Sequence, residues 1–313
     1  MDKQTALEKS IEYFDGDELA ASVFITKYAL TDDVGNILEA TPTDMHHRLA
    51  REFARIESKY DNPLTEDEIF SMLDRFKEVV PQGSPMAGIG NPYQIQSISN
   101  CFVIDSPEDS YGGILKTDQE LVQIAKRRGG VGFDISTIRP KGLTTANAAR
   151  TTDGIEVFMD RFSNSCREVA QGGRRGALML TISVHHPQIR DFIKIKQDLK
   201  RVTGANISIR LTDEFMNAVQ TGTNVQLRFP VESTADHIIT EDADAMTLWN
   251  DMIEAAHAAA EPGLLFWDNA KATTPSDIYE HDGFGSVSTN PCGEIILSPY
   301  DSCRLMLINL TSF

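Results

Sequence analysis

The run Ala177-Leu178-Met179-Leu180-Thr181-Ile182 decides the fold class, because it is a short β-prone segment of the kind that forms strands. Working outward from it, similar runs occur at 101–104, 131–135, 205–209, 225–229 and 264–267. Helical patterns separate these runs along the chain. This alternation predicts an α/β fold with a parallel sheet or barrel.

The first hundred residues carry helical patterns instead. Apolar residues at helical spacing lie at Met45, Leu49, Phe53 and Ile56. Thr65 to Glu68 forms a capping box that predicts the start of a second helix, and Thr117 to Glu120 predicts another helix start further along. We therefore expect a helical N-terminal region over residues 1–80, followed by the sheet over residues 81–313.

Composition and charge exclude several classes of protein. The 313 residues include 29 Lys and Arg against 46 Asp and Glu, a net charge of -17, which argues against a nucleic-acid partner. No apolar run approaches the roughly 20 residues that span a bilayer, and the N-terminus lacks the apolar core of a signal peptide. We expect a cytoplasmic protein without a membrane partner. Two basic loops, Lys126 to Arg128 and Arg174-Arg175, are candidates for holding a small phosphorylated ligand.

The four cysteines are Cys101, Cys166, Cys292 and Cys303. They have no CxxC or Cys/His spacing typical of zinc, so the sequence predicts no metal ligands. Structural disulfides are rare in a reducing compartment, which favours redox or radical chemistry for those that function. Cys166 lies on the apolar stripe of a helix that begins near Asp153, and packing is its favoured role.

Asn290-Pro291-Cys292-Gly293-Glu294 combines an amide, a thiol and a carboxyl at alternate positions. In an extended segment these side chains share one face and converge on one ligand. A turn with an incidental cysteine is the alternative. The run at 304–308 is interpreted as a buried strand. Spacing alone does not show that Cys101 and Cys303 are neighbours.

Several motifs together resemble the N-terminal portion of the catalytic large subunit of ribonucleotide reductase. They are residues 99–104, 129–133, 171–176, 290–294, 298–303 and 308–310, and they follow one another in the order found in that family. The resemblance implies a ten-stranded α/β barrel built from two five-stranded halves. This chain corresponds to the first half, a finger loop and the first strand of the second half, preceded by the helical region.

The resemblance also implies an activity, the reduction of ribonucleotides (diphosphates or triphosphates) to 2′-deoxyribonucleotides. Cys292 matches the cysteine that becomes a thiyl radical, and Cys101 and Cys303 match the pair that ends as a disulfide. Glu294 matches the base that takes the 3′-hydroxyl proton. Asn290 matches the amide that holds the substrate hydroxyls.

Two binding sites follow from the same resemblance. Ser84 and Asn100 correspond to positions that contact substrate. An allosteric effector, a deoxynucleotide or ATP, is expected at Asp109, Arg139, Lys141, Gly173, Arg174 and Arg175.

The implied cofactors and partners lie outside this chain. The radical source is expected to be either a separate metal-containing small subunit or adenosylcobalamin. The sequence at 301–305 slightly favours the class that uses the separate subunit, the two-subunit class. We expect a complementing C-terminal chain, a homodimer formed through the effector-site helices, and a reductant of the thioredoxin or glutaredoxin type. The alternative is a non-catalytic nucleotide-binding and dimerisation module. A glycyl-radical enzyme is disfavoured, because those relying on formate lack the paired cysteines and the glutamate.

Overall fold

The computed structural model describes residues 1–169, 176–233 and 236–313. Four helices open the chain: α1 (Lys3–Tyr13), α2 (Glu18–Lys27), α3 (Pro42–Glu57) and α4 (Glu66–Leu73). They enclose a core of their own, whose buried apolar members include Phe24, Ile25, Met45, Leu49, Ile69 and Leu73. The predicted capping box at Thr65 is confirmed, since its side chain accepts from the Glu68 amide while the Glu68 carboxylate accepts from Thr65.

The segment after residue 80 remains tied to these helices. Strand β1 (Val79–Pro81) leads into helix α5 (Gly83–Gly88). Arg48 of α3 is buried in an ion pair with Glu39 (2.7 Å) and donates to the Met86 carbonyl (2.9 Å) and to the Ile89 carbonyl. Met86 and Ile89 also pack against the N-terminal core. The division between the two regions at residue 80 stays a prediction, although α5, which follows that residue, packs against the N-terminal helices.

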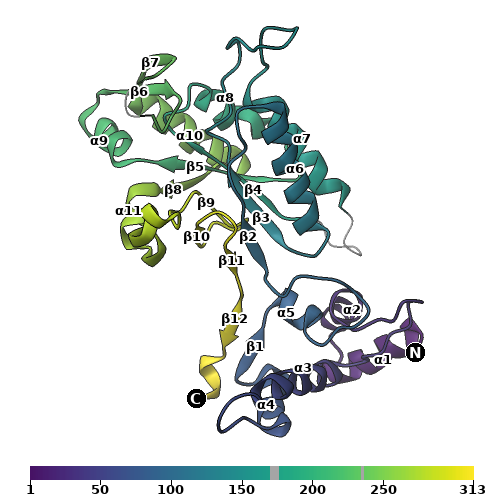
Figure 1. Cartoon of the computed structure of the whole chain (residues 1–313). Coiled ribbons are helices and arrows are strands. Elements are labelled where there is room, and N and C mark those ends of the chain that lie inside the picture. The colour runs from purple at the N-terminus through teal and green to yellow at the C-terminus, as the bar shows by residue number, and fades with distance from the viewer. Residues whose placement is uncertain (170–175, 234–235) are drawn as a thin grey trace.

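The predicted α/β fold is confirmed by a six-stranded sheet in the order β11-β2-β3-β4-β5-β8 (Figure 1). Five strands are parallel: β2 (Cys101–Val103), β3 (Gly130–Asp134), β4 (Leu178–Ser183), β5 (Asn206–Leu211) and β8 (Gly263–Phe266). Strand β11 (Ser302–Cys303) joins β2 antiparallel. The sheet curls into a half-barrel, as the family resemblance implies.

Helices pack on the sheet and close the main core. They are α6 (Tyr111–Ala125), α7 (Ile155–Glu168), α8 (Ile189–Lys194), α9 (Asp213–Thr221) and α10 (Ala245–Ala259). Strands β3 and β4 are buried along their whole length, because helices cover one face and the hairpin of β9 (Ser288–Thr289) and β10 (Ile296–Leu297) lies against the other (Figure 1). Among the described residues, every helix is too short or too polar to span a lipid bilayer.

Two local predictions are wrong. The run at 225–229 is a strand, β6 (Asn224–Phe229), but it pairs antiparallel with β7 (Ile239–Asp244) outside the main sheet. Its alternating burial is typical of such a ribbon.

The second wrong prediction is the helix start at Thr117, which lies inside α6 and is buried. The N-cap is Ser110, whose Oγ accepts from the Gly113 amide at 3.0 Å.

The C-terminal segment differs from the predicted buried strand at 304–308. Strand β12 (Met306–Ile308) pairs antiparallel with β1 and forms a two-stranded ribbon outside the barrel sheet (Figure 1). Its side chains are exposed, with Met306 at 63%. Short elements complete the chain: η1 (Asp74–Phe76), η2 (Ile195–Gln197), α11 (Trp267–Thr273), η3 (Pro275–Asp282) and η4 (Leu310–Ser312).

Candidate active site

The finger is a short hairpin that carries the segment 290–295 at its tip. Strands β9 (Ser288–Thr289) and β10 (Ile296–Leu297) pair antiparallel. Gly293 adopts φ +80, a conformation that favours glycine, and its amide donates to the Asn290 carbonyl at 3.1 Å. The segment is therefore a tight turn, so the interpretation of 290–294 as an extended segment is wrong and the alternative of a turn holds for the backbone. The turn buries Asn290 and leaves Cys292 and Glu294 exposed.

Two glycines of β3 let the finger cross the sheet. A Cβ at Gly132 would lie 1.8 Å from the Thr289 carbonyl oxygen, and one at Gly130 would lie 2.8 Å from a ring carbon of Pro291. Both positions point to the same face because residues alternate along a strand. Asn206 of β5 donates from Nδ2 to the Pro291 carbonyl at 2.8 Å and fixes the finger from the other side. The glycines at 130 and 132 in the motif 129–133 thus allow the backbone of β3 and the finger to approach each other closely.

The fold brings two of the predicted thiols together. Cys101 and Cys303 are direct cross-strand partners in β2 and β11. Their Sγ atoms and a carboxylate oxygen of Glu294 all lie within 4.8 Å of one another. Both cysteines are free thiols and buried, whereas Cys292 is a free and exposed thiol.

Burial keeps these thiols protonated. It raises the pKa of Cys101 to about 12 and also raises the pKa of Cys303. The pKa of Cys292 is raised first by partial burial and then by the negative charge of Glu294. At neutral pH each sulfur therefore keeps its hydrogen, the form that hydrogen-atom transfer requires.

Asn290 lies behind the thiol pair, fully buried. Its Oδ1 accepts from the Thr289 hydroxyl (3.2 Å) and from the Ile295 amide (3.4 Å). Its Nδ2 has no hydrogen-bond partner among the described residues. The amide nevertheless lies close enough to Cys101 to lower the pKa of that thiol, against the larger effect of burial. A buried amide N–H without a firm partner is available to a substrate or to a sulfur.

A cavity of about 200 Å³ opens in front of Cys101 and Cys292. Ser84 and Asn100, both predicted from the resemblance, line it, and Ser84 donates to the Arg128 carbonyl at 3.4 Å. The Asn100 Oδ1 is occupied by the Leu305 amide at 3.2 Å.

Two further residues of this cavity were not assigned to the site from the sequence. Arg128 lines it, and its only signal was the basic loop at 126–128. Tyr28 of the N-terminal region also lines it and had no signal in the sequence.

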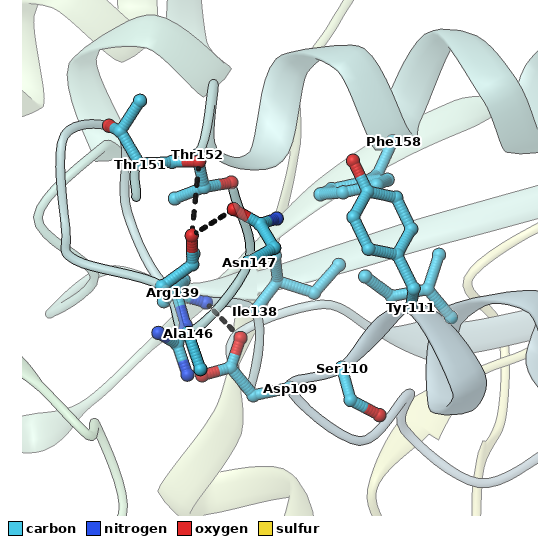
Figure 2. Close-up of a pocket in the computed structure, with 12 residues that line it drawn as sticks. Asp109, Ser110, Tyr111, Ile138, Arg139, Ala146, Asn147, Thr151, Thr152 and Phe158 are labelled. Carbon is cyan, nitrogen blue, oxygen red and sulfur yellow. Dashed lines mark hydrogen bonds and ion pairs between the residues drawn. The ribbon is translucent and has the colours of Figure 1, made fainter. Parts of the chain in front are cut away.

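A second cavity, of about 290 Å³, lies at the start of α6. Asp109 accepts from the Arg139 backbone amide (3.0 Å) and from its Nε (2.8 Å). Figure 2 shows this ion pair on one side of the cavity and the rings of Tyr111 and Phe158 on the other. Lys141 does not line the cavity, and its backbone amide donates to Gln188 instead.

Two groups of predicted residues remain. Gly173, Arg174 and Arg175 lie outside the described residues. Cys166 is buried in the main core on α7, where its sulfur would be 2.7 Å from a Cβ at Gly176. Burial raises the pKa of Cys166 to about 11, and the packing role favoured by the sequence fits this position.

Comparison with known proteins gives a consistent assignment. The family model described as ribonucleotide reductase, barrel domain, matches residues 99–313. The vitamin B12-dependent ribonucleoside-diphosphate reductase of Mycobacterium tuberculosis (strain ATCC 25618 / H37Rv) is 32% identical over 93% of this chain and 40% of its own length. The protein of the same name from Thermoplasma acidophilum is 29% identical over 94% of this chain and 44% of its own. The ribonucleoside-diphosphate reductase large chain of Neurospora crassa is 26% identical over 69% of this chain.

The chain spans less than half the length of these relatives. The family match nevertheless includes the β2 and β11 cysteines, the finger and the whole half-barrel. The chain therefore belongs to the ribonucleotide reductase large-subunit family.

Proposed function

We propose that this chain provides the thiol chemistry for the reduction of ribonucleotides to 2′-deoxyribonucleotides, as the N-terminal part of a larger catalytic unit. The observation that carries the proposal is the grouping of Cys101, Cys303 and Glu294 within 4.8 Å beside the finger that bears Cys292. A redox pair, a base and a separate thiol are the groups that this reaction needs.

In the proposed reaction, the Cys292 thiyl radical takes the ribose 3′ hydrogen atom and later returns it. Glu294 accepts the 3′-hydroxyl proton. The 2′-hydroxyl leaves as water, the 2′ carbon gains a hydrogen, and Cys101 and Cys303 together give up two protons and two electrons as they form a disulfide. Direct cross-strand placement supports this step, because a disulfide needs closely apposed Cβ atoms. An external dithiol of the thioredoxin type then reduces the pair by thiol exchange.

We propose adenosylcobalamin as the radical source, and ribonucleoside diphosphates as substrates. The relatives that match over nine tenths of this chain are named vitamin B12-dependent ribonucleoside-diphosphate reductases, which favours this source over the two-subunit class. When bound, the cofactor supplies the organic radical that activates Cys292. The exposure of Cys292 fits an approach from outside this chain.

The two cavities suggest separate binding roles. We assign substrate contacts to Ser84 and Asn100, since both line the cavity that also contains Cys101 and Cys292. We assign effector binding to Asp109 and Arg139, whose ion pair faces an aromatic wall suited to a nucleotide. We propose that Lys141 lies along the effector phosphates and that the segment bearing Gly173, Arg174 and Arg175 relays the identity of the effector to the substrate base. We also propose a homodimer formed through the neighbouring helices.

The half-barrel offers two open edges to a partner. Within the part of the chain that the structure describes, β8 pairs with β5 alone and β11 pairs with β2 alone. Phe266 of β8 is half exposed, at 50%. Unpaired edges of this kind are normally covered in native proteins. We propose that a second half-barrel, on a complementing chain, closes the sheet.

The test combines this chain with the C-terminal portion of a B12-dependent relative, adenosylcobalamin, a dithiol reductant and CDP, and measures deoxycytidine diphosphate. Turnover is expected, and Cys292→Ser should abolish it because a hydroxyl does not carry the radical at comparable cost. Cys166→Ser is the matched control and should leave turnover nearly unchanged. Nucleotide binding without turnover in the assembled protein would support the non-catalytic module instead, and equal loss in Cys166→Ser would contradict the assigned roles.

A further inference from the structure

The donor atoms that the fold gathers beside the finger have a second use. Cysteine spacing in the sequence predicts no zinc site, because the residues are far apart along the chain. The structure brings two sulfurs and one carboxylate oxygen, from Cys101, Cys303 and Glu294, within 4.8 Å of one another. Two thiolates and a carboxylate are a ligand set that zinc accepts.

We propose that Cys101, Cys303 and Glu294 form a binding site for Zn²⁺ in the reduced protein, with the fourth position open to solvent. Metal binding at this site would hold the two sulfurs apart as thiolates and protect them from oxidation to a disulfide. The proposal does not depend on the proposed enzymatic function, since it concerns only residues of this chain.

The geometry requires a small adjustment. Zinc bonds of about 2.3 Å to sulfur and 2.0 to 2.2 Å to oxygen place the donors of a tetrahedral site about 3.5 to 3.8 Å apart. From their limit of 4.8 Å, the donor atoms must therefore approach one another by at most about 1.0 to 1.3 Å. Glu294 is exposed at the finger tip, so its side chain can turn while the two strand cysteines stay in register.

The surroundings favour a cation with thiolate ligands. Cys101 lines the cavity of about 200 Å³, which gives an ion a route to the otherwise buried sulfur of this residue. Asn290 places a buried Nδ2 beside Cys101 with no other partner among the described residues, and an N–H donor to a coordinating sulfur is typical support for a metal site. The net charge of -17 attracts cations to the protein as a whole.

Binding is balanced by proton release. Each of the two cysteines gives up one proton to the buffer as its sulfur bonds to Zn²⁺, and Glu294 coordinates as a carboxylate. No electron is transferred, so a chelator restores the free dithiol. Oxidation by diamide removes two electrons from the same sulfurs and therefore competes with the metal.

The test uses the whole chain, reduced and freed of metal, titrated with Zn²⁺ against a chromophoric chelator. We expect one Zn²⁺ per chain, with affinity lowered on the order of 100-fold in Cys101→Ser or Cys303→Ser and about 10-fold in Glu294→Gln. The control Cys166→Ser alters a cysteine outside the cluster and should bind as the wild type does. Circular dichroism and thermal unfolding identify any variant that is misfolded.

A measurement on the unmutated chain keeps the test independent of folding. Co²⁺ bound at this site should give sulfur-to-metal charge-transfer absorption, and Zn²⁺ should slow diamide oxidation of the Cys101–Cys303 pair at least about tenfold, as followed by mass spectrometry. Absence of Zn²⁺ binding to the wild type, unaltered affinity in Cys101→Ser, or undiminished oxidation in saturating Zn²⁺ would overturn the proposal. Each of these outcomes leaves the proposed reductase function to its own test.

Discussion

The close approach of the finger to Gly132 predicts that even an alanine side chain at this position destabilises the protein. In Gly132→Ala the new Cβ would lie 1.8 Å from the Thr289 carbonyl oxygen, whereas real Cβ atoms essentially never come closer than 3.0 Å to another heavy atom. Strand β9 must therefore retreat from β3 by about 1.2 Å. Overpacking of this kind costs about 1 to 3 kcal/mol of unfolding free energy. At about 2 °C per kcal/mol, we expect the melting temperature to fall by about 2 to 6 °C.

The same displacement should affect chemistry more than stability. A misplacement of about 1 Å in a reacting group can reduce the rate on the order of 100-fold. We therefore expect a comparable loss of turnover in the assembled enzyme, measured beside calorimetric unfolding of this chain alone.

Gly112→Ala is the matched control for this prediction. The nearest atom to its Cβ is the Ser110 Oγ at 3.8 Å, an ordinary contact, and the residue lies in helix α6. It should gain up to about 1 kcal/mol, because alanine is the better helix former. If Gly132→Ala melted within about 1 °C of the wild type, the close passage of the finger over β3 would be refuted.

Three further predictions concern other parts of the molecule. Burial lowers the pKa of His186 to about 4 from its usual 6.5. Between these two values the unfolded state binds a proton that the folded state does not, so the free energy of unfolding should fall by on the order of 3 kcal/mol as the pH drops from about 6.5 to 4. Denaturant titration measures this fall, and a flat profile would contradict the buried neutral ring. Arg48→Met leaves Glu39 buried without its partner and should cost about 3 to 5 kcal/mol in chemical unfolding, whereas the exposed Arg51→Met should stay within about 0.5 kcal/mol. Asp109→Asn should weaken deoxynucleoside triphosphate binding on the order of 10-fold by calorimetry with little change in melting temperature, since the ion pair is partly exposed; unchanged affinity would remove Asp109 from the effector site.

The sequence predicts the architecture well where local pattern determines it. Short apolar runs separated by helical patterns locate β2, β3, β4, β5 and β8 to within one or two residues. Pattern does not identify the partner of a strand, which is why 225–229 was expected in the barrel sheet although it pairs with β7. The prediction that the run at 304–308 is buried fails for the same reason, because its apolar composition does not show that it pairs with β1 outside the barrel sheet.

The candidate site divides in the same way. The family motifs indicate Cys101, Cys292 and Cys303, but spacing could not show that two of these lie side by side across 202 positions. Tyr28 follows the end of α2, and Arg128 holds that end at the cavity by donating to the Lys27 carbonyl at 2.9 Å, a tertiary contact without local signal. Gly132 shows the converse, since the glycine motif was visible in the sequence while its reason, the passage of another strand, was not.

The position of β11 also has a consequence for how the protein is made. Synthesis runs from the N-terminus, and domains begin to fold as the chain emerges. Strand β2 appears early and has β3 on one side, but its other side waits for residues 302–303. Until those residues have been made, about 200 positions after β2, Cys101 lies at an uncovered edge of the growing sheet. The thiol pair therefore forms well after β2 itself, and an oxidant can reach Cys101 before Cys303 is in place.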